Sequence, residues 1–255
     1  MLANYHTHTY RCGHAVGEDR EYVETAIERG LKVLGFSDHV PMPFPDGRES
    51  NFRVHFAQLD DYVESVLNLR DEYKRDIDIR LGFEAEYYPD LFQAMLARLK
   101  SYPVDYLLLA QHFNDSRETV YNPSMAQDHT ALVRYVDMVI EGMETGVFSY
   151  VAHPDLLYFA GRSAAYRQQM TRLCERAKAL DIPLEINMLG LRTGRCYPND
   201  RFWPIVKAMG CRAVIGCDAH EPNDVAEPKQ LRLAMDFAAR FQVVPEERID
   251  LRKPF

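Results

Sequence analysis

Residues 32–39 read Lys-Val-Leu-Gly-Phe-Ser-Asp-His. A short apolar run of this kind is typical of a buried strand, and here it is followed by two polar side chains, Asp38 and His39. Similar short runs recur along the whole chain. The expected strands are Leu2–Tyr5, Lys32–Phe36, Ile79–Phe83, Asp105–Ala110, Phe148–Val151, Leu184–Ile186 and Arg212–Ile215.

Segments with helical periodicity lie between these runs. Apolar residues at i, i+3 and i+4 form core-facing stripes within Phe56–Tyr73, Leu132–Met143, Tyr166–Leu180 and Leu231–Phe241. Strands that alternate with helices predict an α/β fold with a parallel sheet. In one domain of this length the pattern favours a closed or nearly closed βα barrel. A doubly wound open sheet remains the alternative, since the pattern does not give the strand order.

The composition suits one domain spanning residues 1–255. The chain has 38 acidic and 30 basic side chains, a net charge of −8 and 47% hydrophobic residues. This acidic balance argues against a nucleic-acid partner. No apolar run approaches the roughly 18 residues that span a bilayer, so no membrane partner is expected. The N-terminus has no leader pattern, and the five cysteines form no CxxC pair. We therefore expect reduced thiols and a cytoplasmic protein. The oligomeric state stays open.

Most of the nine histidines follow an expected strand. Side chains at the carboxyl ends of barrel strands converge on one mouth. Neutral imidazoles and carboxylates are good ligands for Zn, Fe or Mn, and ten such groups exceed the needs of one ion. The sequence thus predicts a cluster of two or three divalent ions. The ten groups are His6, His8, His14, Asp38, His39, Glu84, His112, His153, Asp218 and His220.

Some polar residues have a second interpretation. His55 and His129 stand at expected helix starts and are interpreted as surface or capping residues. Asp38 is either a ligand or a partner that orients His39. Glu86 and Asp155 have the same ambiguity. Cys12 lies in a histidine-rich stretch, but one cysteine is weak evidence for a ligand.

The chain resembles the polymerase-and-histidinol-phosphatase (PHP) superfamily from His6 to about His220. The ordered motifs that carry the resemblance are His6-Thr7-His8, Asp38-His39, Glu84, His112, His153 and Asp218-Ala219-His220. Further motifs are closest to the histidinol-phosphate phosphatase branch: Cys12-Gly13-His14, Phe36-Ser37-Asp38-His39, Glu185-Ile186-Asn187 and Gly190-Leu191-Arg192.

The resemblance implies a distorted (β/α)7 TIM-like barrel with three metal ions at its C-terminal mouth. By position, the first ion would be held by His6, His8, Glu84 and Asp218. Glu84 would bridge to a second ion, completed by His112 and His153. The third would be held by His14, His39 and His220. Glu84, Asp218 and His220 are the expected catalytic residues. The expected phosphate-binding arginines are Arg162 and Arg192, with Arg195 in reserve.

The implied activity is hydrolysis of a small phosphate monoester, L-histidinol phosphate in histidine biosynthesis. A hydroxide bridging two of the Zn, Fe or Mn ions would attack phosphorus, and no phosphoenzyme is expected. Asp155, Asp38 and a metal-bound water are the proton donors considered for the leaving group. Three alternatives stay open: a PHP phosphoesterase with another substrate, a metal-dependent amidohydrolase, and a non-catalytic module attached to a nucleic-acid enzyme.

Overall fold

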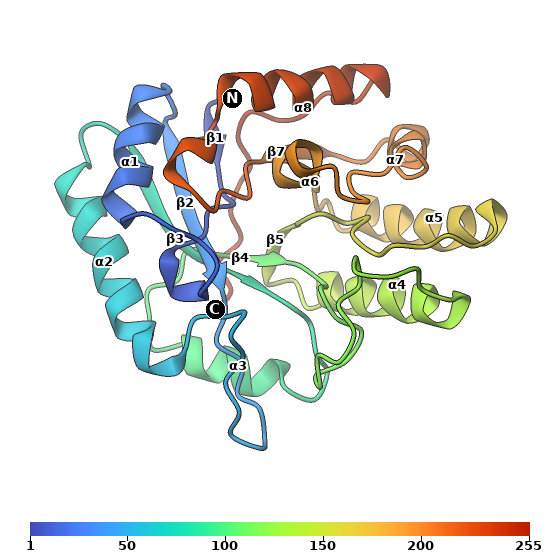
Figure 1. The fold of residues 1–255 in the computed structure, drawn as a ribbon, viewed down its shortest axis with the longest axis horizontal. Coiled ribbons are helices and arrows are strands. Elements are labelled where there is room, and N and C mark those ends of the chain that lie inside the picture. Colours follow the sequence, from blue (N-terminus) through green and yellow to red (C-terminus); the bar gives the residue numbers. More distant parts are fainter.

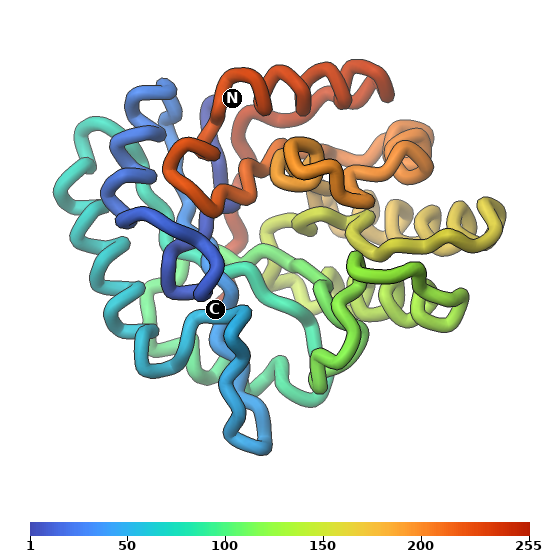
Figure 2. Tube along the Cα trace, in the orientation of Figure 1, coloured from blue at the N-terminus to red at the C-terminus, as the bar shows by residue number.

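The computed structural model describes residues 1–255 and forms one parallel barrel of seven strands. Helices surround the strands, and the colours in Figure 2 follow one another around the barrel in sequence order. Each strand pairs with the next strand along the chain. The strands are β1 (Ala3–Asn4), β2 (Val33–His39), β3 (Asp78–Ala85), β4 (Tyr106–Leu109), β5 (Phe148–Val151), β6 (Leu184–Asn187) and β7 (Ala213–Gly216).

The helices lie outside the strands, as Figure 1 shows. The α-helices are α1 (Asp19–Glu28), α2 (Leu59–Glu72), α3 (Phe92–Leu99), α4 (His129–Glu144), α5 (Ser163–Ala179), α6 (Met188–Thr193), α7 (Trp203–Met209) and α8 (Pro228–Arg240). Three short 3₁₀ helices are η1 (Tyr10–Cys12), η2 (Phe56–Gln58) and η3 (Pro222–Asp224). No helix is both long and apolar enough to cross a bilayer.

Contacts just beyond β1 and β7 bring the two edges of the sheet together. Thr7 and Ala219 form a parallel bridge, and the amide of His8 donates to the carbonyl of Ala219 at 2.9 Å. The consecutive strand order lacks the reversal that a doubly wound sheet requires. The expected α/β barrel, nearly closed, is therefore confirmed, and the open-sheet alternative is wrong.

Two strands end two or more residues beyond the ends that the sequence indicates. The expected ends were Phe36 and Phe83, but β2 continues to His39 and β3 to Ala85. The backbone ladder extends to His39 paired with Glu84. The polar side chains are thus part of the strands, because their backbones still pair while the side chains face the barrel mouth.

The apolar stripes correspond to α2, α4, α5 and α8, but four other helices had no stripe assigned. Of these, α6 and α7 have only 6 and 7 residues, too few for a repeated i, i+3, i+4 pattern. His55 is the N-cap of η2, and His129 begins α4 after its N-cap Asp128. The cap and helix-start interpretations are confirmed. All five cysteines are free thiols.

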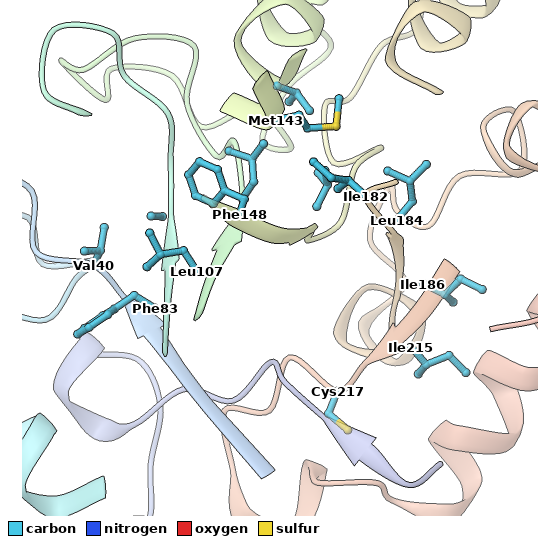
Figure 3. Packing of buried hydrophobic residues seen from close by; sticks show 14 of the residues in the cluster. Val40, Phe83, Leu107, Met143, Phe148, Ile182, Leu184, Ile186, Ile215 and Cys217 are labelled. Atoms are coloured by element: carbon cyan, nitrogen blue, oxygen red, sulfur yellow. The ribbon is translucent and has the colours of Figure 1, made fainter. Parts of the chain in front are cut away.

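The main core lies between the barrel and the surrounding helices. It contains 60 buried residues, and Figure 3 shows strand side chains such as Phe83, Phe148 and Ile215 within it. A fully buried side chain contributes about 1.5–3 kcal/mol by leaving water, so this layer dominates the stability of the fold. The strands are consequently held as a rigid base for the groups at their carboxyl ends.

A second core of 10 buried residues fills the barrel interior below the mouth. Its centre is Tyr106, whose hydroxyl lies 2.8 Å from the carbonyl of Tyr5 and 3.0 Å from that of Phe36. Glycines make room for this ring: a Cβ at Gly35 would lie 2.2 Å from the Tyr106 hydroxyl, and one at Gly82 would lie 2.4 Å from Cε1. The interior is thus a packed floor and not a pore.

Candidate metal centre and substrate cavity

Candidate ligands from six strands meet at the mouth of the barrel. His6 and His8 follow β1, His39 ends β2, Glu84 lies in β3, His112 follows β4, His153 follows β5, and Asp218 and His220 follow β7. Most of these side chains are buried, whereas His220 is partly exposed and His14 is exposed at the rim. Parallel strands place their carboxyl ends at one edge of a barrel, which brings residues distant in sequence together.

Glu84 lies at the centre of this cluster, and its two oxygens face different histidines. Oε1 lies 2.8 Å from Nε2 of His153, 3.4 Å from Nε2 of His6 and 3.6 Å from Nε2 of His112. Oε2 lies 3.0 Å from Nδ1 of His39 and 3.5 Å from Nε2 of His8. A carboxylate with a separate set of imidazoles at each oxygen has the arrangement needed to bridge two ions.

Asp218 provides a second carboxylate on the same side. Its Oδ1 lies 3.2 Å from Nε2 of His8 and 3.6 Å from Nε2 of His6. Its backbone has a φ of 47°, and that of His153 has a φ of 29°. Such left-handed conformations are unfavourable for residues other than glycine and are concentrated at functional sites. The fold therefore holds these two candidate ligands in strained positions.

Several buried ring and carboxylate atoms make no well-aligned hydrogen bond, although charged groups lie close to most of them. They are Nε2 of His6, Nε2 of His8, Nδ1 of His39, Oε2 of Glu84 and Nδ1 of His153. Buried polar atoms are almost always satisfied, so this many in one place requires an explanation. Divalent ions would satisfy them, because neutral imidazole and carboxylate are the donors that such ions prefer. The donor set therefore fits a metal centre.

Other carboxylates contact the ring nitrogens that do not face Glu84. Oε1 of Glu185 lies 2.8 Å from Nδ1 of His6, and Oε1 of Glu86 lies 2.7 Å from Nδ1 of His112. A hydrogen bond at one ring nitrogen fixes the tautomer and leaves the other nitrogen free for a metal. Glu185 was noted in the sequence only as part of a motif. The sequence signal that could have identified Glu185 is the presence of a charged residue within the short apolar run of β6.

The carboxylate of Asp38 contacts the ring of His8 but not the ring of His39. Its Oδ1 lies 3.4 Å from Nδ1 of His8, and its Oδ2 accepts from the amide of Thr9 at 3.1 Å. With His39 it contacts only the backbone amide, at 2.8 Å. The expectation that Asp38 orients the His39 ring is therefore wrong, because the ring next to its carboxylate is that of His8, in the segment that follows the neighbouring strand β1. Asp155 accepts from the amide of Asn199 and does not line the cavity described below.

A third group of rings lies toward the rim. The centroids of His14 and His220 are 4.9 Å apart, and those of His14 and His39 are 5.3 Å apart. Donor atoms of His8, His39 and His220 lie within 4.8 Å of one another, as do those of Cys12, His14 and His220. Cys12 is buried and its Sγ donates to the carbonyl of Thr9 at 3.1 Å. The fold thus adds a thiol beside the imidazoles.

Burial and charge divide the histidines into two kinds. Burial alone would lower the pKa of His6, but Glu185, Asp218 and Glu84 raise it well above the usual value. Burial is opposed in the same way at His8, where the nearby carboxylates of Asp218 and Asp38 raise the pKa. Burial lowers the pKa of His39, and it lowers that of His220 to about 3. The carboxylates thus favour the protonated form of His6 and His8, so a metal ion bound there would compete with protons.

A cavity of about 640 Å³ opens above the candidate ligands, within the usual size range of a small-molecule site. Arg195 lies in its wall, and its Nη1 donates to the hydroxyl of Tyr197 at 2.8 Å with no carboxylate paired to it. Arg192 also lines the cavity but is paired with Asp224 at 2.6 Å. Arg162 is an exposed residue at the N-terminus of α5 and does not line the cavity.

Aromatic rings form another part of the cavity wall. Phe52, Phe113 and Tyr121 come from the two segments that follow β2 and β4. Phe52 packs 4.1 Å from His39 and 5.0 Å from His112, measured between ring centroids. An isolated aromatic residue in a connecting segment has no distinctive spacing, so only the folded structure singles out these three rings.

A βα barrel with histidines and carboxylates around Glu84 at its mouth has the features of a metal-dependent barrel enzyme. The match to the PHP domain family covers residues 4–188, and the chain belongs to this family. Its relatives include a probable histidinol-phosphatase of Deinococcus radiodurans, 28% identical over an alignment of 232 residues, with 88% of each chain covered. A histidinol-phosphatase of Bacillus subtilis is 25% identical over 251 residues, with 86% of this chain and 94% of the relative covered.

Solved structures show the same fold. The histidinol phosphate phosphatase of Lactococcus lactis, solved with Zn, L-histidinol and phosphate, matches with a TM-score of 0.75. The match covers 98% of this chain and 97% of that one at 17% sequence identity. At this identity the likeness establishes the architecture, and the expected distorted seven-stranded barrel is confirmed.

Proposed function

We propose that this chain is a metal-dependent phosphatase that hydrolyses L-histidinol phosphate to L-histidinol and phosphate, a step of histidine biosynthesis. The observation that carries the proposal is the position of Glu84, whose two oxygens each face their own set of histidines below a cavity with an unpaired arginine. The histidinol-phosphatase names of the relatives from two bacteria support the substrate. A small phosphorylated substrate suits the cavity better than a macromolecule.

We assign three divalent ions of Zn, Fe or Mn to the centre. His6, His8, Glu84 and Asp218 would hold the first, because Oδ1 of Asp218 faces Nε2 of both His6 and His8. Glu84 with His112 and His153 would hold the second, and His14, His39 and His220 the third. Bound ions of this kind lower the pKa of water to about 7 and neutralise charge on a phosphoryl group. Glu84, Asp218 and His220 are the catalytic residues in this assignment, because they hold the ions against the reacting group.

The chain's own residues would bind and orient the substrate. Arg195 has no carboxylate partner, so its planar guanidinium is available to two phosphate oxygens. Burial raises the pKa of Tyr121 to about 12, and its hydroxyl therefore keeps its proton in the cavity wall. Arg192 is a weaker candidate, since Asp224 already neutralises it. Arg162 would need a movement of α5 to reach the phosphate.

The organic part of the substrate would lie against the aromatic wall. Phe52 and Phe113 offer apolar surface to an imidazole ring. Glu221 also lines the cavity and is exposed, so its carboxylate is available to an amino group. Such a site would favour an amino alcohol phosphate over a sugar phosphate. Free thiols at all five cysteines support a reducing compartment, and the proposed location is the cytoplasm.

The test is phosphate release by protein loaded with Mn or Zn. L-histidinol phosphate is compared with a sugar phosphate, a nucleoside monophosphate and a phosphodiester. We expect a strong preference for histidinol phosphate, and no phosphorylated side chain after rapid quenching. Glu84→Gln should lower kcat more than about 100-fold. Residues that only hydrogen-bond to a metal ligand already change metal affinity or activity by about 10–100-fold, and Glu84 is itself a proposed ligand. Equal rates on all monoesters would favour a PHP phosphoesterase of another substrate, and a trapped phosphoenzyme would overturn the mechanism.

A further inference from the structure

A buried arginine lies behind the candidate ligand His112. Arg53 is 1% exposed, and its guanidinium pairs with two carboxylates from different parts of the chain. Nη1 lies 2.6 Å from Oε2 of Glu86, and Nη2 forms a short contact with Oε1 of Glu118. The other oxygen of Glu86, Oε1, lies 2.7 Å from Nδ1 of His112. A continuous chain of charged contacts thus runs from Glu118 to a candidate metal ligand.

The three charged residues come from three different connections of the barrel. Arg53 lies between β2 and η2, Glu86 just after β3, and Glu118 between β4 and α4. Both long connections also carry cavity-wall residues: Phe52 is the neighbour of Arg53, and Tyr121 lies three positions after Glu118. Arg53 therefore joins two walls of the cavity to the base of His112.

General stability does not require this arrangement. Removing two charges from water costs several kcal/mol per ion, and well-packed apolar residues are often as stable in such positions. A guanidinium that contacts two carboxylates instead fixes the direction of each, because its planar fork has a defined geometry. Tyr88 adds a hydrogen bond of 3.1 Å from its hydroxyl to Glu118. The orientation of the carboxylates is thus tightly specified.

We propose that Arg53 is a positioning residue with two separable effects. Through Glu86 it holds the ring of His112 so that Nε2 faces Glu84 and a metal ion. Through Glu118 it holds the segment that carries Tyr121 against the substrate cavity. The second effect rests on the proposed function, because its measurement uses the turnover of histidinol phosphate. The first effect is measured with the metal alone.

The test uses conservative variants that break one contact at a time. Glu86→Gln keeps the shape of the side chain but weakens its interaction with His112, and it should lower Zn²⁺ affinity at one site by about 10–100-fold. Glu118→Gln should leave zinc content and affinity unchanged and raise the KM for histidinol phosphate by at least about 5-fold with kcat little changed. Arg53→Lys should show both effects, since an ammonium cannot contact both carboxylates in the same plane.

Arg20→Met is the matched control. Arg20 pairs with Glu72 at the surface, at 2.5 Å, with about half of each side chain exposed. This variant should keep wild-type zinc affinity and KM. Circular dichroism establishes that each variant is folded, and zinc affinity comes from titration of the metal-free protein with Zn²⁺ alone.

Two results would overturn the proposal. One is wild-type zinc affinity in folded Glu86→Gln together with wild-type KM in folded Glu118→Gln. The other is a loss of zinc affinity in Glu118→Gln as large as that in Glu86→Gln, which would show that the two effects are not separable. If Arg53→Lys does not fold, the two glutamine variants still test the proposal, because each of them leaves Arg53 with one ion pair. If wild-type protein binds zinc but does not turn over histidinol phosphate, the proposed function fails while the zinc measurement still tests the role of Glu86.

Discussion

The carboxylate of Glu185 fills the space beside Gly216, where a Cβ would lie only 1.7 Å from Oε1. The same oxygen lies 2.8 Å from Nδ1 of His6, and Oε2 accepts from the backbone amide of His153 at 2.9 Å. Glu185 therefore supports one candidate ligand through its ring and another through its strained backbone. The absence of a side chain at Gly216 makes both contacts possible.

Gly216→Ala should thus damage the metal centre from a position that touches no metal. The added methyl group must push Glu185 away from His6, and we expect zinc affinity to fall by about 10–100-fold. The measurement is titration of metal-free protein with Zn²⁺. Gly146→Ala is the control: Gly146 has open space around it and a φ of 76°, so the change should lower stability but leave zinc affinity intact. Equal zinc affinity in Gly216→Ala and wild type would contradict the role of Glu185.

Removal of metal should lower the melting temperature considerably. Ions that bind only the folded protein stabilise it, by about 4 kcal/mol when one site is held at a thousandfold excess over its Kd. At about 2–4 °C per kcal/mol, this corresponds to a shift of about 8–16 °C. Thermal unfolding with and without a chelator measures it. His55→Ala should show the same shift as wild type, because His55 pairs with Glu49 outside the centre. A melting temperature insensitive to the chelator would show that the buried cluster holds no ion.

Arg195 and Arg162 should differ sharply in their effect on turnover. Arg195→Met removes a cavity-wall cation, and kcat/KM for histidinol phosphate should fall by about 10- to 150-fold, the equivalent of a charged hydrogen bond of 1.5–3 kcal/mol. Arg162→Met changes an exposed residue and should stay within about twofold of wild type. Steady-state kinetics of the two variants side by side provide the measurement. A larger loss in Arg162→Met would mean that α5 moves toward the cavity when substrate binds.

Tyr106→Phe should affect stability and spare the metal centre. The variant leaves the carbonyls of Tyr5 and Phe36 without the hydroxyl that they share in the barrel floor. Buried acceptors without a partner cost about 1–3 kcal/mol, which urea unfolding of the metal-free protein would detect. Zinc affinity should remain at the wild-type value. A variant that loses zinc at unchanged stability would contradict the separation between the floor and the mouth of the barrel.

Much of the candidate site can be recognised from the sequence alone. Histidines and carboxylates that follow short apolar runs, such as His6, Glu84 and His153, must meet if the strands are parallel and adjacent. The residues that orient these ligands cannot be recognised in the same way. Glu185 and Arg53 act through contacts between strands or connections that are distant in sequence, and no local spacing specifies such contacts. The contact of Asp38 with the ring of His8 is likewise a contact between residues distant in sequence.

Periodicity and the order of polar residues along the chain were enough to indicate the seven strands, four of the α-helices and the ligand types, because these depend on near neighbours. The closure of the barrel at Thr7 and Ala219, the exposed position of Arg162 and the fit of Glu185 against Gly216 depend on packing between segments far apart in sequence. Side chains that interact across a barrel carry no periodic signal. Their roles therefore became visible only in the folded arrangement.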